Sequence, residues 1–254
     1  MDFYADRPLV FAHRGAREVA PENTMAAFQA ALAMSADGIE LDVMLSADGI
    51  PVVIHDFTLE RTTNGQGPVG AQTLAQLQAL DAGSHFALRF QGERISTLAQ
   101  VLDAFGGSLR INIELKSYTL VQTGLEATVA RLAAQRGLVS SVIVSSFSPL
   151  SLWRMRRINP HIARGLLYER HMPFFLRRAW AAPLLGLEAV HPEAGMVNAA
   201  YMRWAKRKEY RVNVWTVNEP AEMERLLDLG VDTLITDRPD VARRIVDARR
   251  RGAA

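Results

Sequence analysis

Apolar runs of strand length alternate with amphipathic segments of helix length along the whole chain, and this alternation restricts the fold more than any other feature. The expected strands are Leu9–Ala12, Ile39–Leu45, Leu109–Leu115, Val142–Ser146, Ala163–Leu167, Ala189–His191, Val212–Val217 and Thr233–Ile235. The expected helices are Thr24–Met34, Thr97–Phe105, Leu120–Arg136, Pro149–Ile158, Ala199–Lys208 and Ala221–Leu229. Because each helix returns the chain to the start of the next strand, such a pattern predicts an α/β fold with parallel strands.

The number of expected strands specifies the type of α/β fold. Eight βα units close into a TIM-type (β/α)8 barrel of about 250 residues, and this chain has 254 residues. With 49% hydrophobic and 22% charged residues, it has enough apolar side chains for one large interior. We therefore expect a barrel that forms a single domain over residues 1–254.

One stretch, at about residues 56–95, breaks the repeat. It is rich in glycine and longer than an ordinary connection between a strand and a helix. Loops at the carboxyl ends of barrel strands build the active sites of this fold. We interpret the stretch as a small insertion after the second strand that lies beside the functional site.

Three helix starts carry capping signals. Asn23 precedes the helix at Thr24, Ser148 precedes Pro149, and Asn218 precedes Glu219 and Pro220. A short polar side chain in this position accepts hydrogen bonds from the first turn, and proline suits the first helical residue. We expect Asn23, Ser148 and Asn218 to mark the helix starts.

Composition narrows the classes of partner. Cysteine is absent, so a bound metal must be held by oxygen or imidazole. The net charge is only +2, and the excess of arginine gathers in Arg243, Arg244, Arg249, Arg250 and Arg251. This cluster has no aromatic residues between its arginines, so we interpret it as a solvated helix face and expect no nucleic-acid partner.

Membrane insertion and export are not expected. Residues 1–8 carry charges where a signal peptide would need an apolar run, and no stretch approaches the length of a membrane span. A cytoplasmic enzyme is therefore the expectation. The segment Met172–Trp180 mixes aromatics with arginines, which fits either weak contact with a membrane surface or, as we expect, an ordinary barrel helix.

Polar side chains gather where the first two strands end. His13 and Arg14 close the first apolar run, and Glu40 and Asp42 alternate with apolar residues in the second. Side chains two residues apart on a strand share one face and lie roughly 7 Å apart along it. Two inward carboxylates repel each other and lose hydration, unless a cation or several donors compensate them.

The next strand of the repeat continues this arrangement. Asn112, Glu114 and Lys116 share one face, which adds a third carboxylate. Three oxygen ligands without thiolate suit Mg²⁺ or Ca²⁺. The alternative is an internal salt-bridge network, for example of Glu114 with Lys116 or Arg14.

A second histidine reaches the same region. After the turn signal Asp48-Gly49 the chain returns through Pro51–Ile54 and presents His55 and Asp56. Two imidazoles can divide proton transfer between a nucleophile and a leaving oxygen. That division is what cleavage of a phosphodiester requires.

At this point a resemblance becomes visible. The motifs that carry it are His13-Arg14-Gly15, Pro21-Glu22-Asn23-Thr24, Glu40-Leu41-Asp42-Val43, His55-Asp56, Arg61-Thr62-Thr63, Glu114-Leu115-Lys116 and Thr236-Asp237-Arg238-Pro239. In order and spacing, over nearly the whole chain, they resemble the glycerophosphodiester phosphodiesterase family. The resemblance implies hydrolysis of small glycerophosphodiesters, such as glycerophosphocholine or glycerophosphoethanolamine, to sn-glycerol 3-phosphate and an alcohol.

The resemblance also implies catalytic roles. Glu40, Asp42 and Glu114 would hold one divalent cation, Mg²⁺ or Ca²⁺. His13 and His55 would be the acid/base pair, with neither assigned as acid or base.

Substrate contacts are implied at further positions. Arg14 and Lys116 would contact the phosphate, and Trp215 matches an aromatic residue of the family that shapes the substrate pocket. Phe147 follows the fourth strand, where it is a candidate contact for the glycerol or head group. Ser96 stands where the family commonly has proline, which puts the local rigidity in question and leaves the chemistry unchanged.

Two other functions remain open. The same barrel could act on lipids as a lysophospholipase D or a phospholipase C-like phosphodiesterase. A non-catalytic barrel that binds a phosphorylated metabolite would not need two proton-transfer groups, so the histidine pair speaks against it. His161, His171 and His191 follow no carboxylate cluster, so turn or packing positions are expected for them, and His191 stays a weak candidate because it ends a strand. His85 lies in the insertion and could line the entrance, but a solvated loop position is expected for it.

Overall fold

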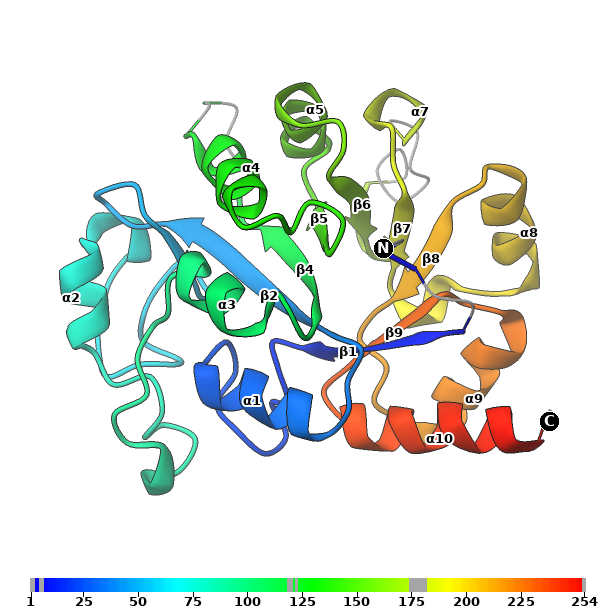
Figure 1. The fold of residues 1–254 in the computed structure, drawn as a ribbon, viewed down its shortest axis with the longest axis horizontal. Helices are drawn as coiled ribbons and strands as arrows, with labels where there is room; N and C mark the ends of the chain where they lie inside the picture. Colours follow the sequence, from blue (N-terminus) through cyan, green and yellow to red (C-terminus); the bar gives the residue numbers. More distant parts are fainter. Residues whose placement is uncertain (1–2, 5–6, 118–120, 122, 174–181, 253–254) are drawn as a thin grey trace.

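The computed structural model describes residues 3–4, 7–117, 121, 123–173 and 182–252. In this part of the chain, eight parallel strands close into a barrel with helices on its outside (Figure 1). The barrel strands are β1 (Leu9–His13), β2 (Gly38–Leu45), β4 (Arg110–Leu115), β5 (Val142–Ser146), β6 (Ala163–Tyr168), β7 (Ala189–Pro192), β8 (Arg211–Val214) and β9 (Thr233–Thr236). Strand β1 pairs with both β2 and β9, which closes the ring. The predicted TIM-type barrel is confirmed.

The outer helices follow the strands in chain order. They are α1 (Met25–Ala33), α3 (Leu98–Phe105), α4 (Leu125–Gln135), α5 (Pro149–Ile158), α7 (Ala182–Leu185), α8 (Ala199–Arg207), α9 (Pro220–Leu229) and α10 (Pro239–Gly252). Most of the predicted segment Met172–Trp180 lies outside the described residues. None of the described helices is long and apolar enough to cross a membrane.

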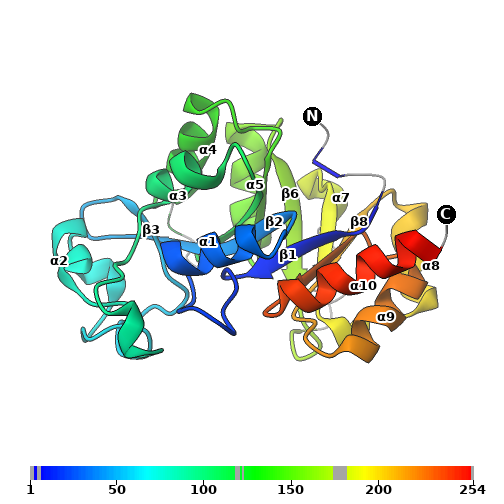
Figure 2. The same cartoon turned by 60° about the horizontal axis from the view of Figure 1, so that its bottom comes forward.

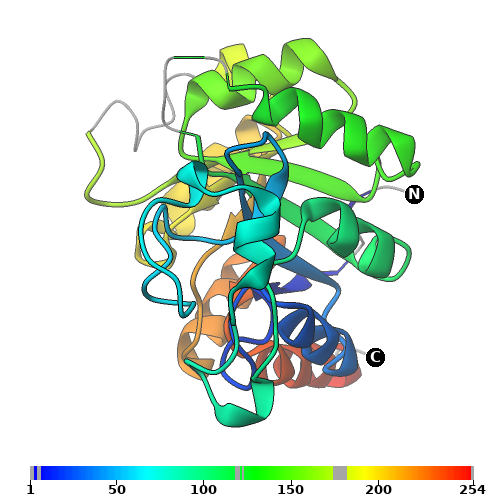
Figure 3. The same ribbon diagram turned by 90° about the vertical axis from the view of Figure 1, so that its left-hand side faces the viewer.

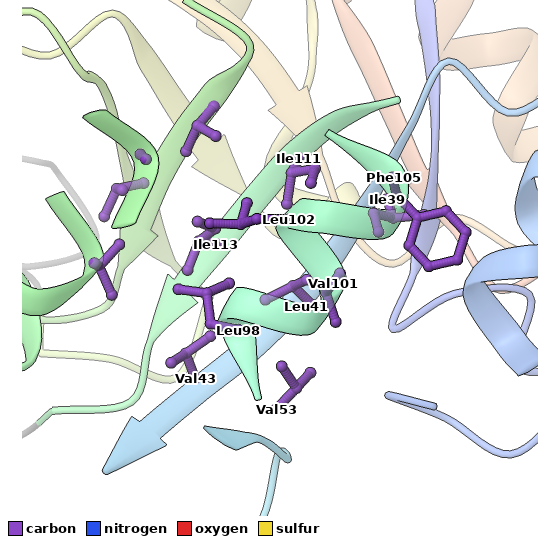
Figure 4. Packing of buried hydrophobic residues seen from close by; sticks show 14 of the residues in the cluster. Ile39, Leu41, Val43, Val53, Leu98, Val101, Leu102, Phe105, Ile111 and Ile113 are labelled. Carbon is purple, nitrogen blue, oxygen red and sulfur yellow. The ribbon is translucent and has the colours of Figure 1, made fainter. Parts of the chain in front are cut away.

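Side chains alternate along β2 and β4, so that apolar residues face the outer helices and polar residues face the inside of the barrel. Figure 4 shows α3 lying on β2 and β4, with Leu98, Val101, Leu102 and Phe105 over Ile39, Leu41, Val43, Ile111 and Ile113. Burial of each such side chain stabilises the fold by about 1.5–3 kcal/mol. Because these residues face outward, the polar residues between them on β2 and β4 are directed into the barrel.

Several predicted boundaries are wrong. The expected strand Val212–Val217 ends at Val214, because Trp215 pairs only in an isolated bridge with Glu193. The helix expected from Leu120 begins at Leu125, since Gly124 before it has a φ of 90°.

The capping residues also differ from the prediction. Ser148 caps α5 as expected, by accepting from the backbone N–H of Ser151. For α1 the cap is Thr24 rather than Asn23, because the Thr24 hydroxyl accepts from the N–H of Ala27. At α9 the capping position is Glu219, which makes no side-chain cap bond.

The predicted insertion follows a short hairpin. Strand β3 (Pro51–Val53) pairs antiparallel with β2, and the chain continues through η1 (Val69–Ala71), α2 (Leu74–Ala79) and η2 (Leu88–Phe90). It extends from one side of the barrel, on the left of Figure 1 and toward the viewer in Figure 3. It shares a small separate core with the hairpin, formed by Met44, Val52, Ile54, Leu59, Val69, Leu77, Ala82 and Ile95.

The insertion joins the barrel at Ser96, which stands where the family commonly has proline. The Ser96 carbonyl accepts from the N–H of Val53 at 2.8 Å, and Thr97 with Gln100 forms a capping box at the start of α3. Backbone pairing and the cap therefore hold this junction without proline.

Helix α10 carries the arginine-rich end of the chain. Figure 2 shows it along the same side of the molecule as α1. The prediction of a solvated arginine face is wrong for Arg243, which is buried and pairs with Asp37 at 3.0 Å and Asp247 at 2.9 Å. Arg244 is exposed, as predicted. Arg243 therefore ties α10 to the barrel.

Candidate active site

The strand register gathers the predicted residues at one end of the barrel. His13 on β1 lies beside Glu40 on β2, and Glu40 lies beside Asn112 on β4. One step further along the strands, Asp42 lies beside Glu114. The carboxylates are adjacent because β2 pairs directly with β4. Strand β3 and the insertion lie between these two strands in the sequence but not in the barrel.

Glu40, Asp42 and Glu114 form a buried acidic cluster. Each offers a carboxylate oxygen, and these three atoms lie within 4.8 Å of one another. Burial and the negative charges of Asp42 and Glu114 raise the pKa of Glu40 well above its ordinary value. Burial and the charge of Asp42 raise the pKa of Glu114 to about 7. The cluster therefore lacks positive charge.

Two cations reach the cluster without balancing it. The Nζ of Lys116 lies 3.0 Å from Oε1 of Glu114 and 3.6 Å from Oδ1 of Asp42. The Nε of Arg14 lies 3.3 Å from the other Asp42 oxygen. Burial opposes ionisation of Asp42, but Arg14 and Lys116 outweigh it and lower its pKa. Two cations face three carboxylates, so the internal salt-bridge alternative compensates only part of the charge.

The donor set fits a divalent cation. Oδ1 of Asp42 is buried and makes no hydrogen bond within the described part of the chain. Three carboxylates with no thiolate are the ligands that Mg²⁺ and Ca²⁺ prefer. The cluster can thus hold a metal ion, which would supply the missing positive charge.

Each predicted catalytic histidine is held by a carboxylate. Nδ1 of His13 lies 2.7 Å from Oδ1 of Asp237, and Nδ1 of His55 lies 2.5 Å from Oδ1 of Asp56. When Nδ1–H donates to a carboxylate, Nε2 is left as the proton-accepting atom. Burial lowers the pKa of His55, which keeps this imidazole neutral at pH 7.

The loop after β1 is bent sharply to place Arg14. Arg14 itself has a φ of 57°, a conformation that costs roughly 1–2 kcal/mol for a residue with a side chain. Its backbone N–H donates to Glu40 at 3.0 Å, and its carbonyl accepts from the N–H of Asn23. At Gly15, with a φ of 83°, an added Cβ would lie 2.6 Å from Ala27. Only glycine therefore fits after Arg14.

The sequence did not predict the residues that hold Asp42, Arg14 and His13 in place. Asn23, predicted to be a helix cap, instead donates through Nδ2 to Asp42 at 2.9 Å. Glu22 accepts from Arg14, and Asp237 holds His13. All three lie inside motifs quoted above, so the signal was present, but a motif does not say what its members contact.

A cavity of about 200 Å³ opens at this end of the barrel. Its lining residues are His13, Arg14, Glu40, His55, Asn112, Glu114, Ser145, Phe147, Leu167, Glu169, Trp215 and Ile235. Most of the predicted site residues therefore face one space. Asp42 and Lys116 are not among the lining residues, and Lys116 is directed to the carboxylates.

Aromatic side chains form one wall of the cavity. The rings of Phe147 and Trp215 pack edge to face, with centroids 5.5 Å apart. Trp215 is fixed by a hydrogen bond from its Nε1 to the carbonyl of His191 at 2.8 Å. Glu169, which the sequence did not single out, contributes a carboxylate to the same cavity.

The other histidines have positions unrelated to the cavity lining. His191 is fully buried and accepts from Asn213 at 2.9 Å, and burial lowers its pKa to about 3. His161 and His85 are exposed. The expectation of packing or turn positions is met for His191 and His161.

Known proteins are similar to this chain in sequence and in fold. Residues 13–241 match the Glycerophosphoryl diester phosphodiesterase family. The chain is 39% identical to a glycerophosphodiester phosphodiesterase of Caldanaerobacter subterraneus subsp. tengcongensis, over 92% of this chain and 96% of the relative. It is 34% identical to a glycerophosphodiester phosphodiesterase of Bacillus subtilis, over 94% of this chain and 87% of the relative.

Solved structures give the same result. A phosphodiesterase of Oleispira antarctica, in complex with the product sn-glycerol-3-phosphate, matches with a TM-score of 0.83 and 32% identity, over 95% of this chain and 97% of that one. A glycerophosphodiester phosphodiesterase of Agrobacterium tumefaciens matches with a TM-score of 0.81 and 32% identity, over 92% and 98%.

Barrel, site and relatives together define the class of the protein: it is a phosphoric diester hydrolase built on a TIM-type barrel. The chain belongs to the glycerophosphoryl diester phosphodiesterase family. Its activity is that of a glycerophosphodiester phosphodiesterase.

Proposed function

We propose that this enzyme hydrolyses small glycerophosphodiesters to sn-glycerol 3-phosphate and an alcohol, with one divalent cation and a histidine acid/base pair. The observation that carries the proposal is the acidic cluster of Glu40, Asp42 and Glu114, two members of which line the same cavity as two carboxylate-held imidazoles. The product in the Oleispira antarctica relative supports the glycerol 3-phosphate half of the substrate.

The acidic cluster would hold Mg²⁺ or Ca²⁺. Oxygen ligands alone suit both cations, and the three carboxylates leave room in the coordination shell for the substrate or water. A bound ion would polarise a phosphoryl oxygen as a Lewis acid. We propose this site for Glu40, Asp42 and Glu114 because Arg14 and Lys116 alone cannot balance the three carboxylates when all of them are ionised.

The side chains around the cluster divide the remaining work. Arg14 lines the cavity and presents a guanidinium to the non-bridging phosphate oxygens. Lys116 adds positive charge near Glu114 as negative charge grows on the phosphoryl group. One of His13 and His55 removes the proton of the attacking oxygen, and the other protonates the departing alcohol.

The attacking oxygen can come from water or from the neighbouring glycerol hydroxyl. Attack by the hydroxyl gives a cyclic glycerol phosphate first, which water then opens. Both routes use the same two imidazoles, because each step needs one base and one acid. Trapping the cyclic phosphate in a single-turnover reaction distinguishes the routes.

A positively charged head group, as in glycerophosphocholine or glycerophosphoethanolamine, fits the cavity wall. Phe147 and Trp215 offer aromatic rings, and Glu169 offers a carboxylate. Aromatic rings and carboxylates bind ammonium groups. The enclosed volume of about 200 Å³ suits a small polar substrate better than an acyl chain.

A cytoplasmic location stays a prediction, which cell fractionation tests.

Release of glycerol 3-phosphate from glycerophosphocholine tests the catalytic assignment. In the presence of Mg²⁺ or Ca²⁺, we expect His13→Ala and His55→Ala each to lower kcat by more than about 100-fold. His161→Ala is the matched control, because His161 is exposed and away from the cavity lining. Activity near that of the wild type in either site variant would reject the histidine pair. Faster hydrolysis of lysophosphatidylcholine than of glycerophosphocholine would favour the lipid-directed alternative.

A further inference from the structure

We propose that Arg61, on the insertion, is a positioning residue that fixes His55 and Arg14 relative to each other. Its guanidinium joins two carboxylates, Asp56 and Glu22, and each of these holds one of the two site residues. The inference rests on the proposed roles of His55 and Arg14 in the reaction.

One edge of the guanidinium holds Asp56. The Nε of Arg61 donates to Oδ2 of Asp56 at 2.5 Å, and Nη2 donates to Oδ1 at 3.1 Å. The same Oδ1 lies 2.5 Å from Nδ1 of His55. Arg61 therefore fixes the plane of the carboxylate that orients the imidazole.

The other edge holds Glu22. Nη1 and Nη2 of Arg61 donate to the two oxygens of Glu22 at 2.9 and 2.7 Å. Oε1 of Glu22 also accepts from Nη1 of Arg14 at 2.9 Å. Burial opposes ionisation of Glu22, but Arg61 and Arg14 lower its pKa to about 2, so this carboxylate stays charged near neutral pH. The network thus runs from His55 to Arg14 without interruption.

The planar fork of arginine is required for this arrangement. The ammonium of lysine is a point charge and cannot donate pairs of parallel hydrogen bonds to two carboxylates. The residues after Arg61 stiffen its backbone: the Thr63 hydroxyl donates to the carbonyl of Leu59 at 2.7 Å and accepts from the N–H of Gly65 at 3.0 Å. These contacts account for Arg61 and Thr63 of the Arg61-Thr62-Thr63 motif.

Arg61 acts through its partners and not on the substrate. It does not line the cavity that His55 and Arg14 face. Its side chain is 47% exposed, and ion pairs at such positions add little to stability. A role in positioning therefore predicts a loss of activity that exceeds any loss of stability.

The test compares Arg61→Ala with Arg136→Ala, using glycerophosphocholine hydrolysis and thermal unfolding. Arg136 makes a similar two-point contact with Asp103, at 2.7 and 2.9 Å, on the outer helices away from the cavity. We expect Arg61→Ala to lower kcat by about 10- to 100-fold. We expect both variants to change Tm by similar, small amounts, and Arg136→Ala to keep wild-type kcat.

A double-mutant cycle assigns the effect to the network. If Arg61 acts through Asp56, the losses in Arg61→Ala and Asp56→Asn will not add in the double variant. Arg61→Lys should remain several-fold below the wild type, because the charge returns without the fork. Full activity of Arg61→Lys, additive losses, or a kcat loss below about 3-fold in Arg61→Ala would each overturn the proposal.

Failure of the proposed function would look different. In that case the wild type itself would not release glycerol 3-phosphate, or His55→Ala would keep its activity. A wild type that depends on His55 while Arg61→Ala is unaffected would reject the role of Arg61 alone.

Discussion

Nδ1 of His13 lies 2.7 Å from Oδ1 of Asp237, although 224 residues separate them in the chain. Closure of the barrel brings them together, because β1 pairs with β9 and places Ala12 beside Thr236. Asn218 fixes Asp237 in turn, by donating to its carboxylate at 2.7 Å and accepting from its N–H at 2.9 Å. The last strand of the barrel thus orients a side chain at the end of the first.

Asp237→Asn tests this orientation. The amide cannot stabilise a protonated His13 and can favour the wrong tautomer, so we expect kcat to fall by about 100-fold or more. The measurement is steady-state hydrolysis of glycerophosphocholine. Asp103→Asn, on the outer helix α3, is the control. A loss below about 3-fold would show that His13 does not depend on Asp237.

Metal binding should stabilise the folded protein through the acidic cluster. A ligand at 100 times its Kd adds about 2.7 kcal/mol to the free energy of unfolding. For a chain of this size that corresponds to a rise in Tm of roughly 5–10 °C. We expect this rise with Ca²⁺ or Mg²⁺ in the wild type and its loss in Asp42→Asn. An equal rise in both proteins would place the ion elsewhere.

His191 should make the fold sensitive to acid. Burial lowers the pKa of His191 from 6.5 to about 3. Between these two pH values the imidazole binds a proton in the unfolded chain but not in the folded chain. Stability therefore falls as the pH falls from 6.5 toward 3, by up to about 1.4 kcal/mol per pH unit. Urea unfolding at pH 7 and pH 5 measures this fall.

The variant His191→Gln removes the titrating group. We expect the difference in stability between pH 7 and pH 5 to shrink by about 2 kcal/mol relative to the wild type. Only the difference between the two pH values is compared, since the substitution also changes packing against Gly165. His161→Gln, at an exposed turn, should keep the wild-type difference. An unchanged difference in His191→Gln would show that His191 does not titrate in this way.

Glu169 should select for a charged head group. Loss of its charge in Glu169→Gln should lower kcat/KM for glycerophosphocholine by about 5- to 30-fold, because the attraction between a carboxylate and an ammonium group close to water is worth about 1–2 kcal/mol. Hydrolysis of glycerophosphoglycerol, which has a neutral head group, should stay within about 2-fold of the wild type. Equal losses on both substrates would mean that Glu169 contacts the part that they share.

Local patterns in the sequence predicted the barrel and its inward carboxylates. Alternation on β2 and β4 places Glu40, Asp42 and Glu114 on one face, because side chains on a strand alternate strictly. The turn at Asp48-Gly49 correctly returned the chain to His55, since Gly49 adopts a φ of 77°. The regular part of the site therefore follows from strand geometry.

The supporting contacts could not be predicted, because they join distant parts of the chain. Asp237 reaches His13 only when the barrel closes, and Arg61 reaches Glu22 only when the insertion packs against the loop after β1. Asn23 has the residue type of a helix cap, yet tertiary contact directs it to Asp42. Side-chain partners of this kind depend on the assembled fold and not on local pattern.

The most direct test of the account is the rate of glycerol 3-phosphate release from glycerophosphocholine by chelator-treated protein, as Mg²⁺ or Ca²⁺ is added back. Because the Lewis acid contributes several kcal/mol, we expect chelation to lower the rate by at least about 100-fold and one of the two ions to restore it. A full rate in excess chelator would contradict a metal held by Glu40, Asp42 and Glu114.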